Sequence, residues 1–240
     1  MLLDTPININ MKKNYAALGK LPRLIGIAIS FAVCIALMFF SCAGLPPERI
    51  EPPPSVPQVM PEVRPEPSVM IMGQGMVSAE KLAAFLLLNN TLADLDFVSA
   101  LSVFYIEEAA AEGVNHDIAF AQMSLETGFL RFGNLVTPDM YNFAGLGATG
   151  LPGPDGLPER GLTFPDPRTG VRAHIQHLKG YASAEPLNQE LVNPRYRFLV
   201  MLERLGTSPT IQGLAGTWAA DPLYSEKIEA ILNRLYQYAF

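Results

Sequence analysis

The sequence predicts an α+β domain that is predominantly helical and carries a loop or β-hairpin lobe in its middle. Apolar residues recur at helical spacing from residue 78 to 130 and again from residue 169 onward. Between these parts, residues 134–166 are dense in glycine and proline, which disfavour helix and favour turns. With 240 residues, 49% of them hydrophobic, the chain is long enough for one packed domain with extensions.

We expect three parts in the chain: a signal segment at 1–41, a linker at 42–74 and the folded domain at 75–240. Four of the 17 basic residues but only one of the 23 acidic residues precede Cys42, and an apolar run covers residues 24–40. Basic residues, an apolar run and then small residues are the order of a secretory signal. Met11 is an alternative start, because two lysines follow it. The many prolines of the linker predict an extended spacer.

The residues around Cys42 are Phe40-Ser41-Cys42-Ala43. They resemble the lipobox of bacterial lipoproteins, in which the cysteine is acylated and becomes the new N-terminus, although Phe stands where Leu is usual. The resemblance implies that Cys42 carries a lipid anchor. The alternative is an uncleaved signal anchor, although the apolar run is slightly short for a span of ~20 residues. In both cases we expect the domain outside the cytoplasm, attached to a membrane of the cell envelope.

Composition argues against several classes of function. A net charge of −6 disfavours nucleic acid as a partner, because phosphate binding requires clustered lysine and arginine. Both cysteines, Cys34 and Cys42, lie in or beside the apolar run, so the domain has no thiolate ligands for a metal. His174 and His177 share a helix face but have no evident third ligand. We interpret them as part of a polar helix face and expect neither a metal nor a cofactor.

Capping signals and apolar spacing predict where the helices begin and end. Gly113 is expected to end the second helix, and either Asn115 or Asp117 is expected to open the third. Ser208 and Asp221 each precede a proline and are expected to cap two later helices. The helices are expected near residues 78–89, 96–112, 115–130, 169–181, 195–205, 209–215 and 222–238, with a short hairpin near 157–164.

Glu126 is the only ionisable residue between Ile118 and Leu130, and it lies close to the end of the third helix. Apolar surroundings disfavour the charged form of a carboxyl group and raise its pKa. A carboxyl group that remains protonated near neutral pH is what a glycosidase needs to protonate a leaving oxygen. Position alone favours a solvated surface glutamate instead, because acids are rarely buried.

Three segments carry motifs that occur together in one protein family: AQMSLETG at 121–128, NFAGL at 142–146 and WAADPLY at 218–224. In order, they resemble the Ala-Gln-x-x-x-Glu-[Ser/Thr]-Gly, Asn-Leu-Phe-Gly-Ile and Tyr-Ala-Thr-Asp-Pro-x-Tyr motifs of a bacterial glucosaminidase family. This family, glycoside hydrolase family 73, includes autolysins and flagellar rod muramidase-like enzymes. Ala144 replaces the family's Phe, and Gly147 stands where Lys is common, so that wall of the cleft is expected to differ. The resemblance covers about residues 101–235.

The resemblance implies a lysozyme-like fold with a long cleft between a helical lobe and a loop lobe. It implies that Glu126 is the catalytic acid and that the substrate is the glycan strand of peptidoglycan, cut at the β-1,4 bond after N-acetylglucosamine. For Trp218 a place in the core is an equal alternative, and for Asp221 we prefer an N-cap. The residues expected to bind substrate are Asn142, Phe143, Gly145, Trp218 and Tyr224.

A second carboxylate is harder to identify. By position relative to the family, Glu159 is the best match for a base or nucleophile. Asp155 and Asp166 are alternatives, although aspartate in such contexts more often forms turns. Assistance by the N-acetyl group of the substrate would remove the need for a second carboxylate. Two other functions stay open: a lytic transglycosylase that works with one glutamate, and a peptidoglycan-binding lipoprotein without activity.

Overall fold

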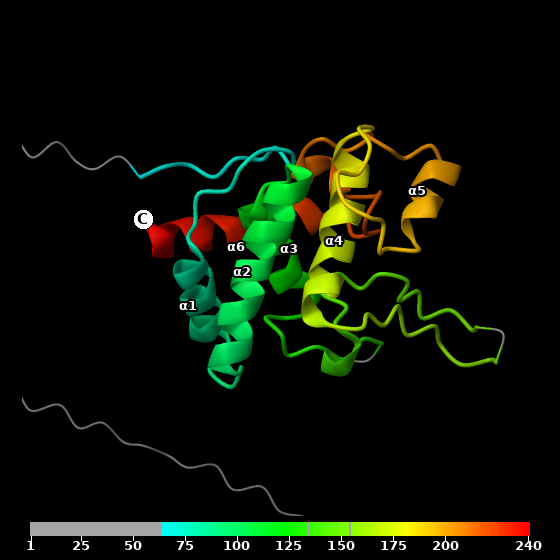
Figure 1. Ribbon diagram of the computed structural model, residues 1–240, viewed down its shortest axis with the longest axis horizontal. Helices are drawn as coiled ribbons and strands as arrows, with labels where there is room; N and C mark the ends of the chain where they lie inside the picture. Colours follow the sequence, from blue (N-terminus) through cyan, green and yellow to red (C-terminus); the bar gives the residue numbers. More distant parts are fainter. Residues whose placement is uncertain (1–63, 134, 154) are drawn as a thin grey trace, which may run out of the picture. The chain divides into compact units, whose positions relative to one another are not determined.

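The computed structural model describes residues 64–133, 135–153 and 155–240. The predicted signal segment, Cys42 and most of the proline-rich linker lie outside the described residues. Within the described residues, the predicted predominantly α architecture is confirmed (Figure 1). The elements in chain order are α1 (Ala79–Asn89), α2 (Leu95–Glu112), α3 (His116–Glu126), the 3-10 turn η1 (Pro138–Met140), α4 (Pro167–Ala182), α5 (Tyr196–Met201), the 3-10 turn η2 (Ile211–Leu214) and α6 (Tyr224–Ala239).

The first three helices begin and end where local hydrogen bonds satisfy their terminal groups. Ser78 caps α1 by accepting from the backbone N–H three residues later, as predicted. Gly113 ends α2 in the left-handed conformation, with a φ of 73°. Of the two residues that could open α3, Asn115 is the one that caps it, through its side-chain oxygen.

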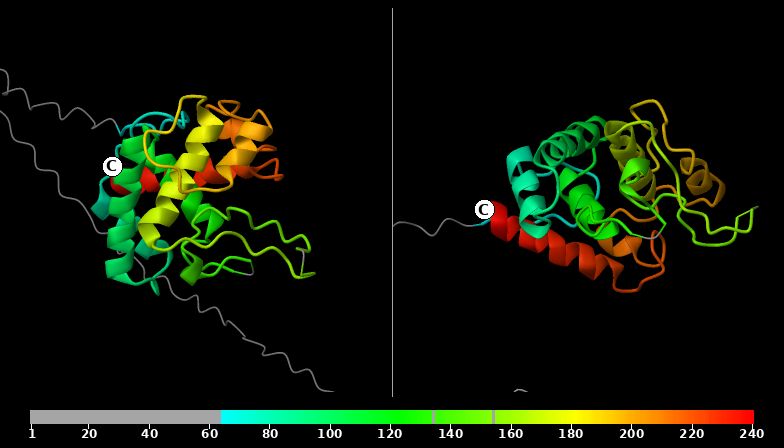
Figure 2. Two further views of the ribbon diagram at one scale, coloured as in Figure 1. Left: turned by 45° about the vertical axis from the view of Figure 1, so that its right-hand side comes forward. Right: turned by 90° about the horizontal axis from the view of Figure 1, so that it is seen from below.

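Helix α3 lies at the centre of the domain, with α2, α4 and α6 packed around it. Figure 2 shows α2 and α6 on opposite sides of α3. All residues from 116 to 124 are buried, so α3 is enclosed on almost every face except at its C-terminal end. The core around it includes Tyr105, Phe120 and Met123, each fully buried. No helix among the described residues is both long and apolar enough to cross a membrane.

The segment ahead of α1 is packed onto the domain. Ile71 is fully buried. The carboxylate of Asp117 accepts hydrogen bonds from the backbone N–H groups of residues 76 and 77, at 2.7 and 3.2 Å, and from the Tyr236 hydroxyl at 2.8 Å. These bonds satisfy a buried charge and hold the segment against both α3 and α6. The packed part of the chain therefore includes residues on the N-terminal side of Gly75.

The third helix is shorter than predicted. It ends at Glu126, so the prediction that it reaches Leu130 is wrong. Gly128, Phe129 and Leu130 all have positive φ, between 57° and 60°, and a right-handed helix cannot continue through them. Thr127 stabilises the break, because its hydroxyl donates to a carbonyl of the last helical turn at 2.8 Å and accepts from the Leu130 N–H at 2.9 Å.

The C-terminal helices also depart from the prediction. Helix α5 is shorter than expected, and the helix predicted at 209–215 is only the 3-10 turn η2. Ser208 does not cap that turn, because its hydroxyl donates to the Gly213 carbonyl at 2.8 Å. Asp221 does not cap α6, because its carboxylate binds the N–H two residues later and the Lys227 ammonium instead. Both capping predictions are therefore wrong.

The lobe between η1 and α4 is irregular, as predicted. Backbone hydrogen bonds pair residues 150–153 with 157–159, and one antiparallel bridge joins Pro152 and Pro158. The pairing therefore lies closer to the N-terminus than the hairpin predicted at 157–164. No strand forms in the part of this lobe that the structure describes, which fits prolines that have no N–H to extend a ladder.

Candidate active site

Glu126 is the last residue of α3, and its carboxyl group meets side chains from the segment that leads into α6. Trp218 Nε1 donates to Glu126 Oε1 at 3.1 Å, and the Tyr224 hydroxyl donates to the same oxygen. The second oxygen, Oε2, faces Gly145: a Cβ atom at that glycine would lie 3.5 Å from it. The structure therefore brings together four of the predicted site residues, which come from three separate parts of the chain.

The electrostatic environment of Glu126 favours the protonated acid. Burial raises the pKa of Glu126, and the hydrogen bonds from Tyr224 and Trp218 partly offset this rise. Because Oε1 already accepts two hydrogen bonds, the proton of the neutral acid belongs on Oε2. When Glu126 is protonated, its exchangeable proton thus lies on the oxygen that faces Gly145.

Two cavities meet beside this carboxyl group. One, of about 300 Å³, is lined by Glu126, Asn142 and other residues of the loop lobe. The other, of about 270 Å³, is lined by Trp218 and by residues of α4 and the loop lobe. Gly145 and Ala148 line both, so the cavities adjoin and form a cleft between the helical part and the loop lobe. Gly145 has a φ of 63°, which favours glycine and keeps the wall opposite Oε2 free of a side chain.

Asn142 and Phe143 support the wall of this cleft. The Asn142 side chain is almost completely buried and forms three hydrogen bonds of 2.9 Å to backbone groups of Leu146 and Leu162. The Phe143 ring is 1% exposed and packs against the rings of Phe97 and Phe132. The prediction of a sugar contact therefore does not fit the Phe143 side chain, which lies in the core. Asn142 lines the first cavity but is occupied in holding the loop.

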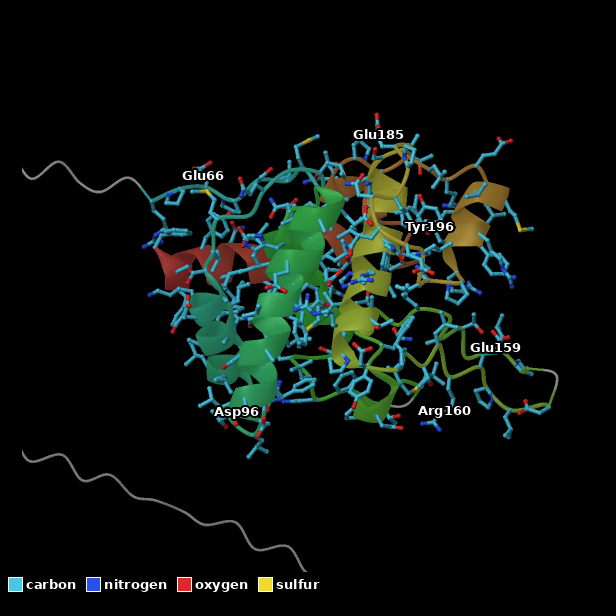
Figure 3. The ribbon with its side chains drawn as sticks, in the orientation of Figure 1. Glu66, Asp96, Glu159, Arg160, Glu185 and Tyr196 are labelled. Carbon is cyan, nitrogen blue, oxygen red and sulfur yellow. The ribbon has the colours of Figure 1, made fainter. Side chains whose placement is uncertain are left out.

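The structure does not bring Glu159 to Glu126. Glu159 is exposed on the outer part of the loop lobe, where Thr149 Oγ1 donates to it at 2.7 Å (Figure 3). It lines a third cavity, of about 440 Å³, whose lining does not include Glu126. The two other candidates for the second carboxylate stabilise local structure. Asp155 accepts from the N–H of residue 157 at 3.0 Å, and Asp166 caps α4.

The interpretation of His174 and His177 as a polar helix face is wrong for His174, which is fully buried, whereas His177 is half-buried and lines the second cavity; both rings pack against Trp218. Burial lowers the pKa of His174 to about 3 and that of His177 to about 4, so both are neutral. Their ring centroids lie 5.8 and 5.2 Å from that of Trp218. The nearby Lys179 is also buried and pairs with Glu112 at 2.9 Å. Hydrogen bonds to Tyr105 and Gln122 satisfy the ring of His174, which the sequence had led us to place on a polar surface.

Sequence reasoning missed the role of Gln122. Its side-chain nitrogen donates to the Tyr224 hydroxyl at 2.9 Å, and the residue is fully buried. Gln122 lies four residues before Glu126, so both occupy the same face of α3. This spacing, together with the place of Gln122 in the motif at 121–128, could have identified it as a neighbour of the site.

Comparisons with known proteins agree with this arrangement. Residues 103–237 match the family model Glucosaminidase, described as mannosyl-glycoprotein endo-beta-N-acetylglucosaminidase. An uncharacterized protein of Borreliella burgdorferi (strain B31) is 39% identical over 168 residues, which cover 70% of this chain and 78% of that protein. The predicted lysozyme-like, predominantly α fold class is thereby confirmed. The matched region contains Glu126, Gly145, Trp218 and Tyr224, and the chain belongs to the glucosaminidase family, whose members are glycosidase-type enzymes.

Proposed function

We propose that the domain is a peptidoglycan hydrolase of glycoside hydrolase family 73 that cleaves the β-1,4 bond after N-acetylglucosamine, with Glu126 as general acid. The environment of that carboxyl group is the observation that carries the proposal. One oxygen is held by two donors, the other faces a cleft, and burial raises the pKa. A protonated carboxyl aimed into a cleft can protonate a glycosidic oxygen.

In the proposed reaction, the proton on Glu126 Oε2 moves to the bridging oxygen while the bond from that oxygen to the sugar C1 breaks. The bonding electrons leave with the oxygen, and Glu126 becomes a carboxylate. The donors from Trp218 and Tyr224 stabilise this negative charge as it forms. In the second step a water molecule attacks C1, so that its oxygen bonds to the sugar while its proton passes to the Glu126 carboxylate, which restores the acid.

Positive charge at C1 requires a second stabilising group. Among the described residues, Glu126 is the only carboxylate that lines either of the two adjoining cavities. This favours stabilisation by the N-acetyl group of the sugar, which can attack C1 from within the substrate. Glu159 would serve only if the loop lobe moved it towards the cleft.

Because a lytic transglycosylase can work with one glutamate, the single carboxylate in the cleft also favours this second candidate function. There the same residue protonates the leaving oxygen, and a hydroxyl of the muramic acid residue itself then closes on C1. The product carries an anhydro end, whereas a glucosaminidase releases a reducing N-acetylglucosamine end. Mass spectrometry of the digested glycan therefore separates the two reactions.

We also propose that the chain is a lipoprotein of the cell envelope, anchored through Cys42. The lipobox-like residues 40–43 and the proline-rich spacer after them support this location. The protein is expected to incorporate labelled palmitate in cells, and replacement of Cys42 by serine is expected to abolish this labelling; an unlabelled wild-type protein would favour the uncleaved signal anchor.

The decisive experiment compares the full chain, purified in detergent, with its Glu126→Gln variant on isolated peptidoglycan. We expect reducing ends from the unaltered chain and at least ~10²-fold fewer from the variant, because general acid catalysis contributes 10²–10⁴-fold. Glu226→Gln, at an exposed position in the first turn of α6, is the matched control and should keep full activity. Glycan binding without product release from the unaltered chain would instead support the non-catalytic alternative.

A further inference from the structure

A chain of hydrogen bonds leads from Glu126 into the core of the domain. The Tyr224 hydroxyl binds Glu126 Oε1 and accepts from Gln122 Nε2 at 2.9 Å. Gln122 Oε1 lies 2.9 Å from His174 Nε2, and His174 Nδ1 lies 3.0 Å from the Tyr105 hydroxyl. The five side chains come from α2, α3, α4 and α6, so this chain of hydrogen bonds connects four helices of the domain.

The far end of this chain is sealed from solvent. Tyr105, Gln122 and His174 are each 0% exposed, and Tyr224 is 5% exposed. Among the described residues, His174 is the only hydrogen-bond partner of the Tyr105 hydroxyl. A buried hydroxyl proton without an acceptor is costly, so the Tyr105 O–H must donate to His174 Nδ1.

This constraint fixes the direction of every later bond. Burial lowers the pKa of His174 to about 3, so the ring is neutral and carries one N–H. Because Nδ1 accepts from Tyr105, the ring proton is on Nε2 and is donated to Gln122 Oε1. The amide of Gln122 then presents its NH₂ group to the Tyr224 oxygen. Tyr224 can therefore direct its own proton only towards Glu126.

No charged side chain lies between Tyr105 and Tyr224 in this chain of hydrogen bonds. The other titratable groups packed around it are His177, which is neutral, and Tyr181, whose pKa is raised by burial. The charge of Arg195 lowers the pKa of His177 but does not shift the pKa of Glu126, His174 or Tyr224. Burial also raises the pKa of Tyr224, so its hydroxyl remains a donor.

We propose that Tyr105, His174 and Gln122 are positioning residues, which lock the Tyr224 hydroxyl as a donor to Glu126 Oε1 and so reserve Oε2 for the reacting proton. The inference rests on the proposed role of Glu126 as the acid. It assigns a function to three core residues that do not touch the cleft. Their effect reaches the acid through the direction of hydrogen bonds, not through contact with substrate.

The proposal is tested by reversing the direction of the hydrogen bond between Gln122 and Tyr224. Gln122→Glu places an acceptor where the NH₂ group was, so the Tyr224 proton turns away from Glu126, and a carboxylate that loses a donor has a higher pKa. We expect the alkaline limb of the kcat/KM profile on peptidoglycan to move up by about one pH unit. Gln176→Glu is the matched control: Gln176 is also fully buried, but it binds backbone groups near residues 190–192. It should lower stability without moving the limb.

A second pair of variants removes a hydroxyl without adding charge. Tyr105→Phe frees the far end of the chain, whereas Tyr236→Phe removes a buried hydroxyl bonded to Asp117. Similar losses of melting temperature are expected for both. Only Tyr105→Phe should raise the alkaline limb, by a few tenths of a pH unit to one unit.

The outcomes separate this inference from the proposed function. If the unaltered chain is active and Glu126→Gln is not, while Gln122→Glu and Tyr105→Phe leave the alkaline limb unchanged, the positioning role is overturned and the acid role stands. If the unaltered chain releases no product, the proposed function fails. The pKa of Glu126, followed by the ¹³C shift of its carboxyl group, then decides the inference without activity: no rise in Gln122→Glu would reject it.

Discussion

Replacement of Tyr224 by phenylalanine tests how the pKa of Glu126 is set. The substitution removes one hydroxyl, which donates to Glu126 Oε1 and accepts from Gln122. The ring remains, so the packing of α6 on α3 is retained. Two effects follow, one on the acid and one on the stability of the fold, and they are separable because they are measured differently.

The effect on the acid is a difference between two protonation states. A hydrogen bond to a charged group contributes about 1.5–3 kcal/mol and one to a neutral group about 0.5–1.5, so the Tyr224 donor favours the carboxylate by about 1–1.5 kcal/mol. At 1.36 kcal/mol for each pKa unit, its loss raises the pKa of Glu126 by roughly one unit. The carboxylate that forms during proton transfer also loses this donor, so the plateau rate should fall up to ~10-fold.

The effect on stability comes from Gln122. Its buried NH₂ group loses its acceptor, which costs about 1–3 kcal/mol. For a domain of this size, each kilocalorie lowers the melting temperature by roughly 2–4 °C. Tyr236→Phe is the control, because it removes a hydroxyl from an equally buried ring far from Glu126 in the hydrogen-bond network.

The assay is the pH dependence of kcat/KM on isolated peptidoglycan, with thermal unfolding in parallel. A general acid must be protonated, so the rate falls as pH rises through its pKa, and a higher pKa moves this limb to higher pH. We expect the shift in Tyr224→Phe and not in Tyr236→Phe. If Tyr224→Phe lost stability while its alkaline limb stayed in place, the hydroxyl would not set the pKa of Glu126 and our reasoning would be refuted.

Two further substitutions test the shape of the site. Gly145→Ala should lower kcat/KM by at least ~10-fold, because its Cβ would lie 3.5 Å from Glu126 Oε2, and the positive φ should cost about 1–2 kcal/mol of stability. An unchanged rate with the expected stability loss would mean that substrate does not approach from this side. Glu159→Gln should change the rate less than ~3-fold if the substrate's N-acetyl group stabilises C1, since a missing base or nucleophile costs ~10²-fold or more. A loss of that size would assign the second carboxylate to Glu159.

The proposed acid, Glu126, and its immediate partners could be predicted from the sequence. Glu126 is a single ionisable residue in an apolar helix, and the motif at 218–224 led to Tyr224 and Trp218. The structure brings both side chains to the same carboxyl oxygen. What the motif did not predict is that Trp218 belongs both to the packed interior and to the cleft. Its indole N–H binds Glu126 while its ring packs on two histidines.

The errors have a common physical origin. Helical spacing places His174 and His177 on one helix face, and polar residues on a face are normally assigned to solvent. Here the partner of His174 is Tyr105, 69 residues away, and the partner of the neighbouring Lys179 is Glu112, 67 residues away; both partners come from α2. Such long-range pairs leave no local pattern. In the same way, the break after Glu126 depends on three consecutive residues of positive φ, two of them apolar, which propensity alone disfavours.

The position of the acid at the C-terminal end of α3 combines requirements that oppose one another. The preceding turns are buried, which makes the carboxyl group rigid and raises its pKa. The negative end of the helix dipole disfavours a charged carboxylate there as well, so it acts in the same direction as burial. If the pKa rose too far, however, the carboxyl group would hold its proton too tightly to donate it. Two donors on Oε1 restrain the rise in pKa, and Glu126 lines the cleft with Oε2 towards Gly145. The break in the helix thus leads the chain from Glu126 directly into the wall of the cleft, since Thr127, Phe132 and Gly133 line the same cavity as the proposed acid.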